Sequence, residues 1–295
     1  MRLLAVAFDA VGQESAFGVD SPPMFKKLTE TYLHGPLQST KTAHTGPANT
    51  AIYEGKDRSD IHGTGKAMKV IPWNKIENPM IFDILAEANV KMGLMNLPLS
   101  NPVNPYKHFV IVHETRTPPS QLSHYPEEIG KYLENYQGDI LNELGTEAYV
   151  KMIHNGQKAF SLSKKYAYSK VDVFKTLCAE RDVDFGFIYF DFTDRIAHII
   201  NRSNPVVKSM MLLCGDILSN LMISLKPEHT LTFSDHGWGF HGDVMPGPGL
   251  HNPIGFYIYT GKEGPRKEAK ILDLAPTILR EFNIDAPSYM EGKPL

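Results

Sequence analysis

The chain has 295 residues, and its 30 lysines and arginines against 33 aspartates and glutamates give a formal net charge of −3. This balance disfavours a protein that binds a nucleic-acid polymer through a basic surface. The composition, 42% hydrophobic and 21% charged, is that of a globular protein and excludes disordered and fibrous classes. The length is sufficient for one large core or two modest ones.

The cysteines and the most apolar segments bear on the compartment. The chain has two cysteines, Cys178 and Cys214, and no CxxC unit. Two cysteines are too few for a disulfide framework, which favours a reducing compartment. The first residues, MRLLAVAFDA, lack the apolar region and cleavage site of a signal peptide and are interpreted as a strand. The apolar segment 209–225 is interrupted by polar residues and is shorter than a membrane span, so it predicts a buried amphipathic helix. We therefore expect a cytoplasmic protein with no membrane partner.

Three short apolar runs each end next to acidic residues. LLAVAF precedes Asp9, FGFIYF precedes Asp191 and Asp194, and HTLTFS precedes Asp235. Each run has the length and composition of a buried strand. Because ligands of parallel sheets bind outside the carboxyl ends of the strands, we expect these acids to converge on one cleft.

Segments of helical periodicity lie between the predicted strands and begin at Pro79, Val171 and Ser209. The tail ILDLAPTILREFNI predicts a further helix, with Pro276 in its first turn. This alternation predicts an α/β fold, a three-layer sandwich whose central, mostly parallel sheet is covered on both faces. The stretch 100–170 is rich in Pro, Tyr, His and Lys and has few strand signals. We interpret it as an inserted cap, with a variable helical excursion that has no substrate role as the alternative.

Several carboxylates and imidazoles have the spacing of metal ligands. Asp194 and His198 are four residues apart, which places both on one face of a helical turn; a chance surface pair is the alternative. Asp235 and His236 are adjacent after a predicted strand, where a helix cap or turn is the alternative. His251 follows a Gly/Pro-rich segment, and a lone loop histidine commonly has no role.

Together the predicted strand ends supply three carboxylates and three imidazoles, from Asp9, Asp194, Asp235, His198, His236 and His251. This set is sufficient for two divalent metal ions, Zn²⁺ in the first place and Mn²⁺ as the alternative. Two such ions about 4 Å apart can hold the attacking and leaving oxygens of an in-line displacement. Because these residues extend over nearly the whole chain, we expect residues 1–295 to form one domain.

Thr45 is the candidate nucleophile. In the segment TGPAN, Gly46 and Pro47 predict a tight turn before a helix that starts near Ala48. The Thr45 hydroxyl would then lie near the backbone N–H groups of a helix N-terminus, which is a position suited to an anion. A plain threonine N-cap is the alternative.

The order of these motifs resembles the alkaline phosphatase superfamily and, within it, the type I phosphodiesterase and nucleotide pyrophosphatase branch. The motifs are, in chain order, Asp9, TGPAN at Thr45, TAIYEGKDRSDIHG, TDRIAH, SDHG, His251 and LDLAPTILREFNIDAP with MEGKPL. The resemblance implies one metal ion held by Asp194, His198 and His251, and another held by Asp9, Thr45, Asp235 and His236. It also implies that Thr45 attacks phosphorus and that water then hydrolyses a phosphoryl-threonine intermediate.

Three departures from the family pattern bear on the substrate. The Thr45 frame has neither the leading cysteine or serine nor the arginine of sulfatases, which disfavours sulfatase activity, and Gly46 stands where an aromatic residue stacks a nucleotide base. The asparagine expected beyond the H-G pair is missing, and Asn49 or Lys66 is the predicted substitute as a contact to the phosphoryl oxygens. A lysine there would favour a more anionic group, such as a phosphomonoester.

The predicted function is metal-dependent hydrolysis of a phosphodiester or pyrophosphate bond in a small, nucleotide-like molecule. A phosphomonoesterase or phosphate mutase of the same superfamily is the alternative. A non-catalytic binding protein is disfavoured because all seven ligand positions carry suitable residue types, and a nicotinamide oxidoreductase because no GxGxxG follows a predicted strand. His241 is a candidate contact to the substrate or leaving group, with a solvated loop position as the alternative.

Overall fold

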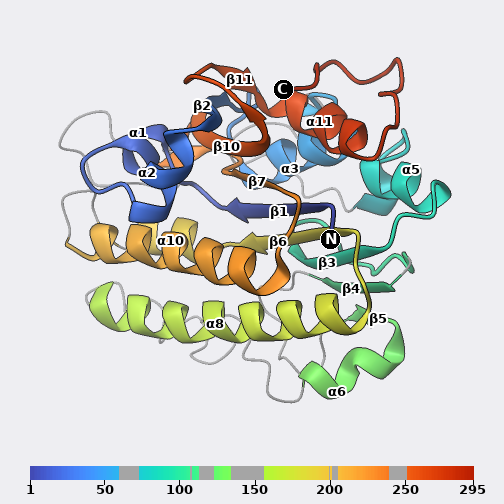
Figure 1. Ribbon diagram of the computed structural model, residues 1–295, viewed down its shortest axis with the longest axis horizontal. Helices are drawn as coiled ribbons and strands as arrows, with labels where there is room; N and C mark the ends of the chain where they lie inside the picture. The colour runs from blue at the N-terminus through green and yellow to red at the C-terminus, as the bar shows by residue number, and fades with distance from the viewer. Residues whose placement is uncertain are drawn as a thin grey trace.

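The computed structural model describes residues 1–59, 73–106, 108–112, 123–133, 156–198, 200, 205–238 and 251–295. Nine strands form one sheet in the order β11-β2-β10-β7-β1-β6-β3-β4-β5 (Figure 1). These strands are β1 (Leu3–Phe8), β2 (Tyr32–Gln38), β3 (Met92–Leu97), β4 (His108–Val112), β5 (His124–Tyr125), β6 (Phe185–Phe190), β7 (His229–Phe233), β10 (Ile254–Glu263) and β11 (Ala269–Lys270). A separate pair joins β8 (Gly237–Trp238) to β9 (His251–Asn252).

The middle of the sheet is parallel. Strand β1 pairs in parallel with both β6 and β7, and β3 pairs in parallel with β6 and β4. Strand β10 is antiparallel to β7 and β2, and β5 is antiparallel to β4. The predicted mostly parallel central sheet is confirmed, and the three apolar runs that precede the acids are its adjacent strands β7, β1 and β6.

The helices divide between the two faces of this sheet. The longer ones are α3 (Thr45–Glu54), α8 (Gly156–Glu180), α10 (Val206–Leu225) and α11 (Leu274–Glu281). The shorter ones are α1 (Gln13–Phe17), α2 (Pro23–Thr29), α5 (Ile81–Glu87), α6 (Gly130–Leu133) and α9 (Phe192–Ala197), with 3-10 turns η2 (Trp73–Lys75), η4 (Glu127–Ile129) and η5 (Ile271–Asp273).

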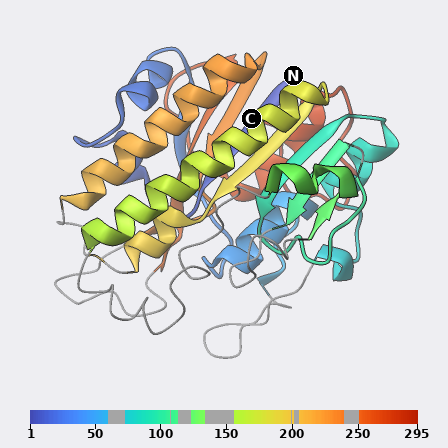
Figure 2. The ribbon, with the colours of Figure 1, turned by 90° about the horizontal axis from the view of Figure 1, so that it is seen from below.

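Alternating side chains of β1 contribute to two hydrophobic cores. Leu4, Val6 and Phe8 pack in one core with α2, α8 and α10, and Leu3 and Ala5 pack in the other with α3, α5 and α11. Figure 2 shows α8 and α10 lying side by side across their face of the sheet. Because each strand presents successive side chains to opposite faces, a strand that is apolar at every position requires a layer of helices on both sides. The three-layer α/β fold is confirmed.

Helix α10 is long and apolar enough to cross a membrane when judged by length and composition alone. In this structure more than half of it is buried inside the protein, where it packs against α8 and α2. Its buried residues include Met211, Cys214 and Leu218. A helix that is buried against a sheet and a neighbouring helix is apolar over most of its surface, as a membrane helix is. This explains why α10 is apolar enough to resemble a membrane span.

The stretch 100–170 differs from the predicted cap at both of its ends. Strand β4 lies beside β3 inside the central sheet, and β5 extends the sheet by one more strand. The predicted boundary at Lys170 falls within α8, which runs from Gly156 and covers the sheet. The short apolar sequence HFVIV of β4 is the strand signal that the polar composition of its surroundings obscured. Residues 113–122 and 134–155 of this stretch lie outside the described part.

Candidate metal centre

The carboxyl ends of β1 and β7 bring two acids of distant sequence together. In the parallel register Ala7 lies beside Phe233, and Asp9 and Asp235 each follow two residues later. Both side chains are buried. The predicted convergence of acids at one edge of the sheet therefore follows from the register of adjacent parallel strands.

His236 completes a first group with these two carboxylates. Its Nε2 lies 3.3 Å from Asp9 Oδ1 and 3.6 Å from Asp235 Oδ2, and the ring is fully buried. Its Nδ1 lies 3.2 Å from the carbonyl oxygen of Gly237, to which it donates. In the tautomer that ligates a metal, this hydrogen bond holds the proton on Nδ1 and leaves the lone pair on Nε2, the nitrogen that faces the carboxylates.

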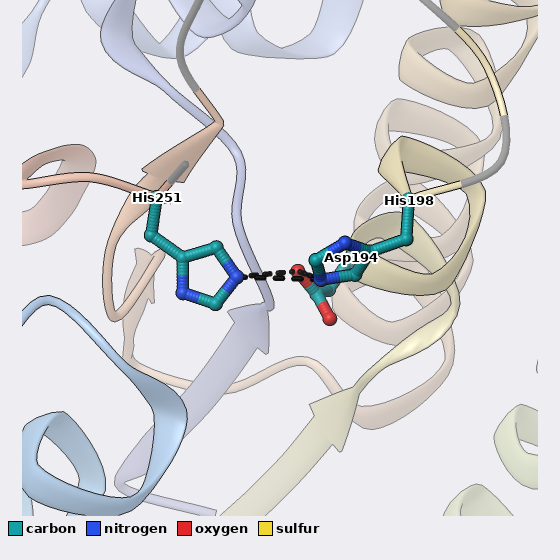
Figure 3. Close-up of side chains that lie close together, drawn as sticks. All are labelled: Asp194, His198 and His251. Carbon is teal, nitrogen blue, oxygen red and sulfur yellow. Dashed lines mark hydrogen bonds and ion pairs between the residues drawn. The ribbon is translucent and has the colours of Figure 1, made fainter. Parts of the chain in front are cut away.

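Asp194, His198 and His251 form a second group (Figure 3). Asp194 Oδ1 lies 3.3 Å from His198 Nε2 and 3.5 Å from His251 Nε2, and the two Nε2 atoms are 3.3 Å apart. Asp194 is in α9 and His198 is the residue that ends it, so the four-residue spacing places both on one side of the turn. The Nδ1 atom of His251 donates to the carbonyl of Ala43 at 2.9 Å, which leaves its Nε2 lone pair for the group.

The two groups are adjacent parts of one centre. The rings of His236 and His251 are stacked, with centroids 4.1 Å apart and an interplanar angle of 13°. Each group presents three ligand atoms that all lie within 4.8 Å of one another, one set from Asp194, His198 and His251, the other from Asp9, Asp235 and His236. The structure thus brings together the six carboxylates and imidazoles that the sequence predicted, in the two sets that the family resemblance implies.

Thr45 lies at the edge of the first group. Its Oγ1 is 3.4 Å from both Asp9 Oδ2 and His236 Nε2. Helix α3 begins at Thr45 itself, with His44 as the N-cap in an extended conformation. The prediction of a turn at Gly46 and a helix from Ala48 is therefore wrong by three residues, because Pro47 is compatible with the first turn of a helix and need not precede it.

The side chain of Asn49, which was predicted as a contact to the phosphoryl oxygens, forms its hydrogen bonds within the protein. Its side chain is fully buried, and its amide nitrogen donates to the Thr45 carbonyl at 2.9 Å and to Asp235 Oδ2 at 3.2 Å. Its oxygen accepts from Tyr53 at 3.2 Å. Asn49 lies one helical turn after Thr45 in α3, and its amide nitrogen donates to the carboxylate of Asp235 at the end of β7.

Tyr189 holds the same carboxylate. Its hydroxyl donates to Asp235 Oδ2 at 3.0 Å and lies 3.4 Å from the amide nitrogen of Asn49. Burial, strengthened by the charge of Asp235, raises the pKa of Tyr189 well above its usual range, so the phenol remains a donor. The sequence analysis missed this residue; its signal is a hydroxyl within the otherwise apolar strand FGFIYF.

A buried ion-pair network fixes the start of α9 beside Asp194. Lys170 Nζ lies 3.1 Å from Asp191 Oδ1, and Arg195 Nε lies 2.9 Å from Asp191 Oδ2. Lys170 is 5% exposed and Asp191 is 8% exposed. This network was also missed, although Lys170 lies on the buried side of α8, where a lysine requires a partner.

The electrostatics of the centre favour a bound cation. Burial and the neighbouring carboxylates of Asp235 and Asp194 raise the pKa of Asp9 well above its usual range. Burial, together with the charge that His236 can carry, lowers the pKa of His251 to about 3, so this ring is neutral. Although burial opposes it, the hydrogen bond from His198 lowers the pKa of Asp194.

The residues present fit metal ions. The Oδ1 atom of Asp9 is buried and has no hydrogen-bond donor among the residues that the structure describes. Buried carboxylates that raise one another's pKa, next to imidazoles whose lone pairs are directed by hydrogen bonds, are the donors that divalent ions such as Zn²⁺ bind. A divalent ion would compensate the mutual repulsion of the carboxylates.

Two predicted site residues, Lys66 and His241, lie outside the described residues, so their prediction as contacts to the substrate stays a prediction. His44 is described and lies beside His251, with ring centroids 4.8 Å apart.

No protein-family model matches the sequence, and no curated protein matches it. The fold is similar to several solved structures. Murine ectonucleotide pyrophosphatase/phosphodiesterase 5 is 12% identical, with a TM-score of 0.58 over 98% of this chain and 97% of that one. Alkaline phosphatase PafA is 11% identical, with a TM-score of 0.58 over 100% of this chain and 98% of that one. A 2-O GAG sulfatase is 11% identical, with a TM-score of 0.57 over 100% of this chain and 73% of that one.

These structures define the class of fold. The chain has an alkaline phosphatase-like α/β fold, which is the fold that the predicted resemblance implies, and it is similar to a nucleotide pyrophosphatase/phosphodiesterase and to an alkaline phosphatase alike. The similar structures are hydrolytic enzymes, among them a phosphodiesterase, a phosphatase and a sulfatase.

Proposed function

We propose that the protein is a two-metal hydrolase of small-molecule phosphoesters that uses Thr45 as its nucleophile. The observation that carries the proposal is the position of Thr45 Oγ1, 3.4 Å from Asp9 Oδ2 and from His236 Nε2, beside a group of metal-ligand type. Support also comes from a fold neighbour, the murine phosphodiesterase, whose inactive variant with a threonine replaced by alanine was solved with AMP.

The two side-chain groups would each hold one divalent ion, with Zn²⁺ as the proposed metal and Mn²⁺ as the alternative. Asp194, His198 and His251 would hold one, and the group around Asp9 would hold the other together with Thr45. When bound, the ions lower the pKa of the attacking hydroxyl and neutralise charge on the phosphoryl and leaving oxygens. Hydrogen bonds from Tyr189 and Asn49 keep the Asp235 carboxylate oriented toward its group.

The reaction would proceed in two displacements at phosphorus. In the first, a bond forms between Thr45 Oγ1 and phosphorus, the bond from phosphorus to the leaving oxygen breaks, and the threonine proton ends on the leaving group. In the second, a water oxygen bonds to phosphorus, the bond from phosphorus to Thr45 Oγ1 breaks, and the proton lost by the water returns to Thr45 Oγ1 as the phosphoryl product leaves. The chain contributes mainly positioning and charge stabilisation.

The proposed substrate contains a phosphodiester or pyrophosphate bond in a small, nucleotide-like molecule, and the proposed location is the cytoplasm. A phosphomonoesterase or phosphate mutase is the second candidate, and the fold neighbour that favours it is an alkaline phosphatase. Sulfatase activity is disfavoured because Thr45, which cannot become formylglycine, occupies the nucleophile position.

The test compares wild type with Thr45→Ala and Thr45→Ser on bis-p-nitrophenyl phosphate and p-nitrophenyl phosphate, with metal content measured for each protein. We expect Thr45→Ala to lower turnover about a thousandfold or more while it retains two metal equivalents, and Thr45→Ser to retain part of the activity because it keeps a hydroxyl. Faster turnover of the diester than of the monoester supports the first candidate, and the reverse supports the second. Undiminished turnover by Thr45→Ala would contradict both.

A further inference from the structure

A cavity lies apart from the residues of the metal centre. It has a volume of about 630 Å³ and is lined by residues 38–41 after β2, residues 56–59 after α3, residues 270–272 at the end of β11, and Glu291. None of the seven predicted metal-ligating residues lines it. Cavities of this size bind small molecules.

Lysines dominate the charge of the lining. Lys41, Lys56 and Lys270 come from three separate segments, and none of their ammonium groups has an ion pair with any residue that the structure describes. Arg58 also lines the cavity, but it is held by Glu54, with Nη2 2.7 Å from Oε1. Lys41 and Lys270 are exposed and Lys56 is partly buried, so solvent compensates these charges until an anion binds.

The acidic residues of the lining are fewer than its lysines, and one of them is engaged in hydrogen bonds. Asp57 accepts hydrogen bonds from the Lys41 backbone N–H at 3.2 Å and from the Ser59 N–H and hydroxyl at 2.9 and 2.6 Å. These donors, from its own turn and from the segment at Lys41, stabilise the charge of its carboxylate. Glu291 is the other acid of the lining, so, with Arg58 paired to Glu54, three lysines face two carboxylates.

The cavity and the metal centre share one wall. Ser39, which lines the cavity, donates from Oγ to the carbonyl of Asp235 at 2.6 Å, and four residues later the Ala43 carbonyl accepts from His251. The segment that leads to Thr45 therefore has the cavity on one side and the ligand groups on the other. The cavity is a separate space behind this segment.

We propose that this cavity is a binding site for a small molecule with several phosphate groups, distinct from the position where phosphoester chemistry takes place. The three lysines come from different segments, so they can contact charges that are spread over a molecule, and a single phosphate would occupy only a small part of the volume. The inference goes beyond the proposed function, because the site requires neither Thr45 nor a bound metal.

Calorimetric titration with myo-inositol hexasulfate tests the site, because this polyanion contains no phosphorus for the enzyme to hydrolyse. The metal-loaded protein is compared with the triple variant Lys41→Gln, Lys56→Gln and Lys270→Gln. The matched control, Lys26→Gln, Lys27→Gln and Lys262→Gln, removes three exposed lysines that do not line the cavity. Inorganic phosphate at equal ionic strength is the single-anion probe.

We expect one equivalent of hexasulfate to bind wild type, and the cavity variant to bind it about ten- to a hundredfold more weakly. The control variant should bind like wild type, and inorganic phosphate should bind more weakly than hexasulfate. Equal weakening in the control, absence of saturable binding, or phosphate binding as tight as hexasulfate would overturn the proposal. Binding that survives the cavity substitutions and is lost in His251→Ala would assign the anion to the metal centre and would also overturn it.

Discussion

The hydroxyl of Tyr189 should determine how tightly the group around Asp9 binds its metal. The change Tyr189→Phe removes one oxygen from a fully buried position and keeps the ring, so packing with the core is retained. It also removes the 3.0 Å hydrogen bond to Asp235 Oδ2. A hydrogen bond to a charged group contributes about 1.5–3 kcal/mol, which corresponds to roughly ten- to a hundredfold in an equilibrium constant. Loss of an outer partner of a metal ligand has effects of the same size.

The assay is a competition for Zn²⁺ between the protein and a chelator of known affinity, with urea unfolding of the same samples. We expect the affinity of one of two metal equivalents to fall about ten- to a hundredfold in Tyr189→Phe. Tyr53→Phe is the control, because the Tyr53 hydroxyl lies 3.2 Å from Asn49 Oδ1 and 3.1 Å from the Pro98 carbonyl, to one of which it donates, and it has no hydrogen bond to Asp235. If both variants bind both equivalents like wild type, or if both weaken equally, the argument that Tyr189 orients Asp235 is refuted.

Three further changes have defined outcomes. His251→Ala should lose one of two metal equivalents in elemental analysis, because its Nε2 belongs to only one group, and retention of both would contradict the assignment. Burial raises the pKa of the Cys178 and Cys214 thiols, so the folded protein keeps protons that the unfolded chain releases above about pH 8.5. The free energy of unfolding should therefore fall as pH rises above that value, less steeply in the double alanine variant, and native thiols should resist alkylation. Gly55→Ala should lower the free energy of unfolding by about 1–2 kcal/mol, because φ is +73° at the end of α3 and a Cβ would meet Met290; an unchanged urea midpoint would contradict this.

The part of the site that could be predicted from the sequence depends on patterns among residues that are close together along the chain. The runs before Asp9 and Asp235 are strands because they are short, apolar and followed by polar residues, and parallel register then brings the acids to one edge. The four-residue spacing of Asp194 and His198 determines their relation on the helix that Asp191 begins. For these residues, local pattern and general sheet geometry are sufficient.

The remainder depends on contacts between distant segments that no local pattern encodes. The roles of Tyr189 and Asn49 arise where β6 and α3 meet Asp235, more than forty residues away in sequence from either. The expected end of the cap near Lys170 falls within α8 for a related reason, because a helix that supports the sheet and one that forms a cap have the same periodicity. The start of α3 at Thr45 was missed because a Gly-Pro pair is compatible with both a turn and a first helical turn.

The most direct test of the central claim is mass spectrometry of the protein after acid quench during turnover of bis-p-nitrophenyl phosphate. The account predicts a covalent p-nitrophenyl phosphoryl group on Thr45, formed with release of one p-nitrophenol and absent in Thr45→Ala. Rapid turnover by wild type with Thr45 unmodified at every quench time, and with comparable activity in Thr45→Ala, would contradict a threonine nucleophile.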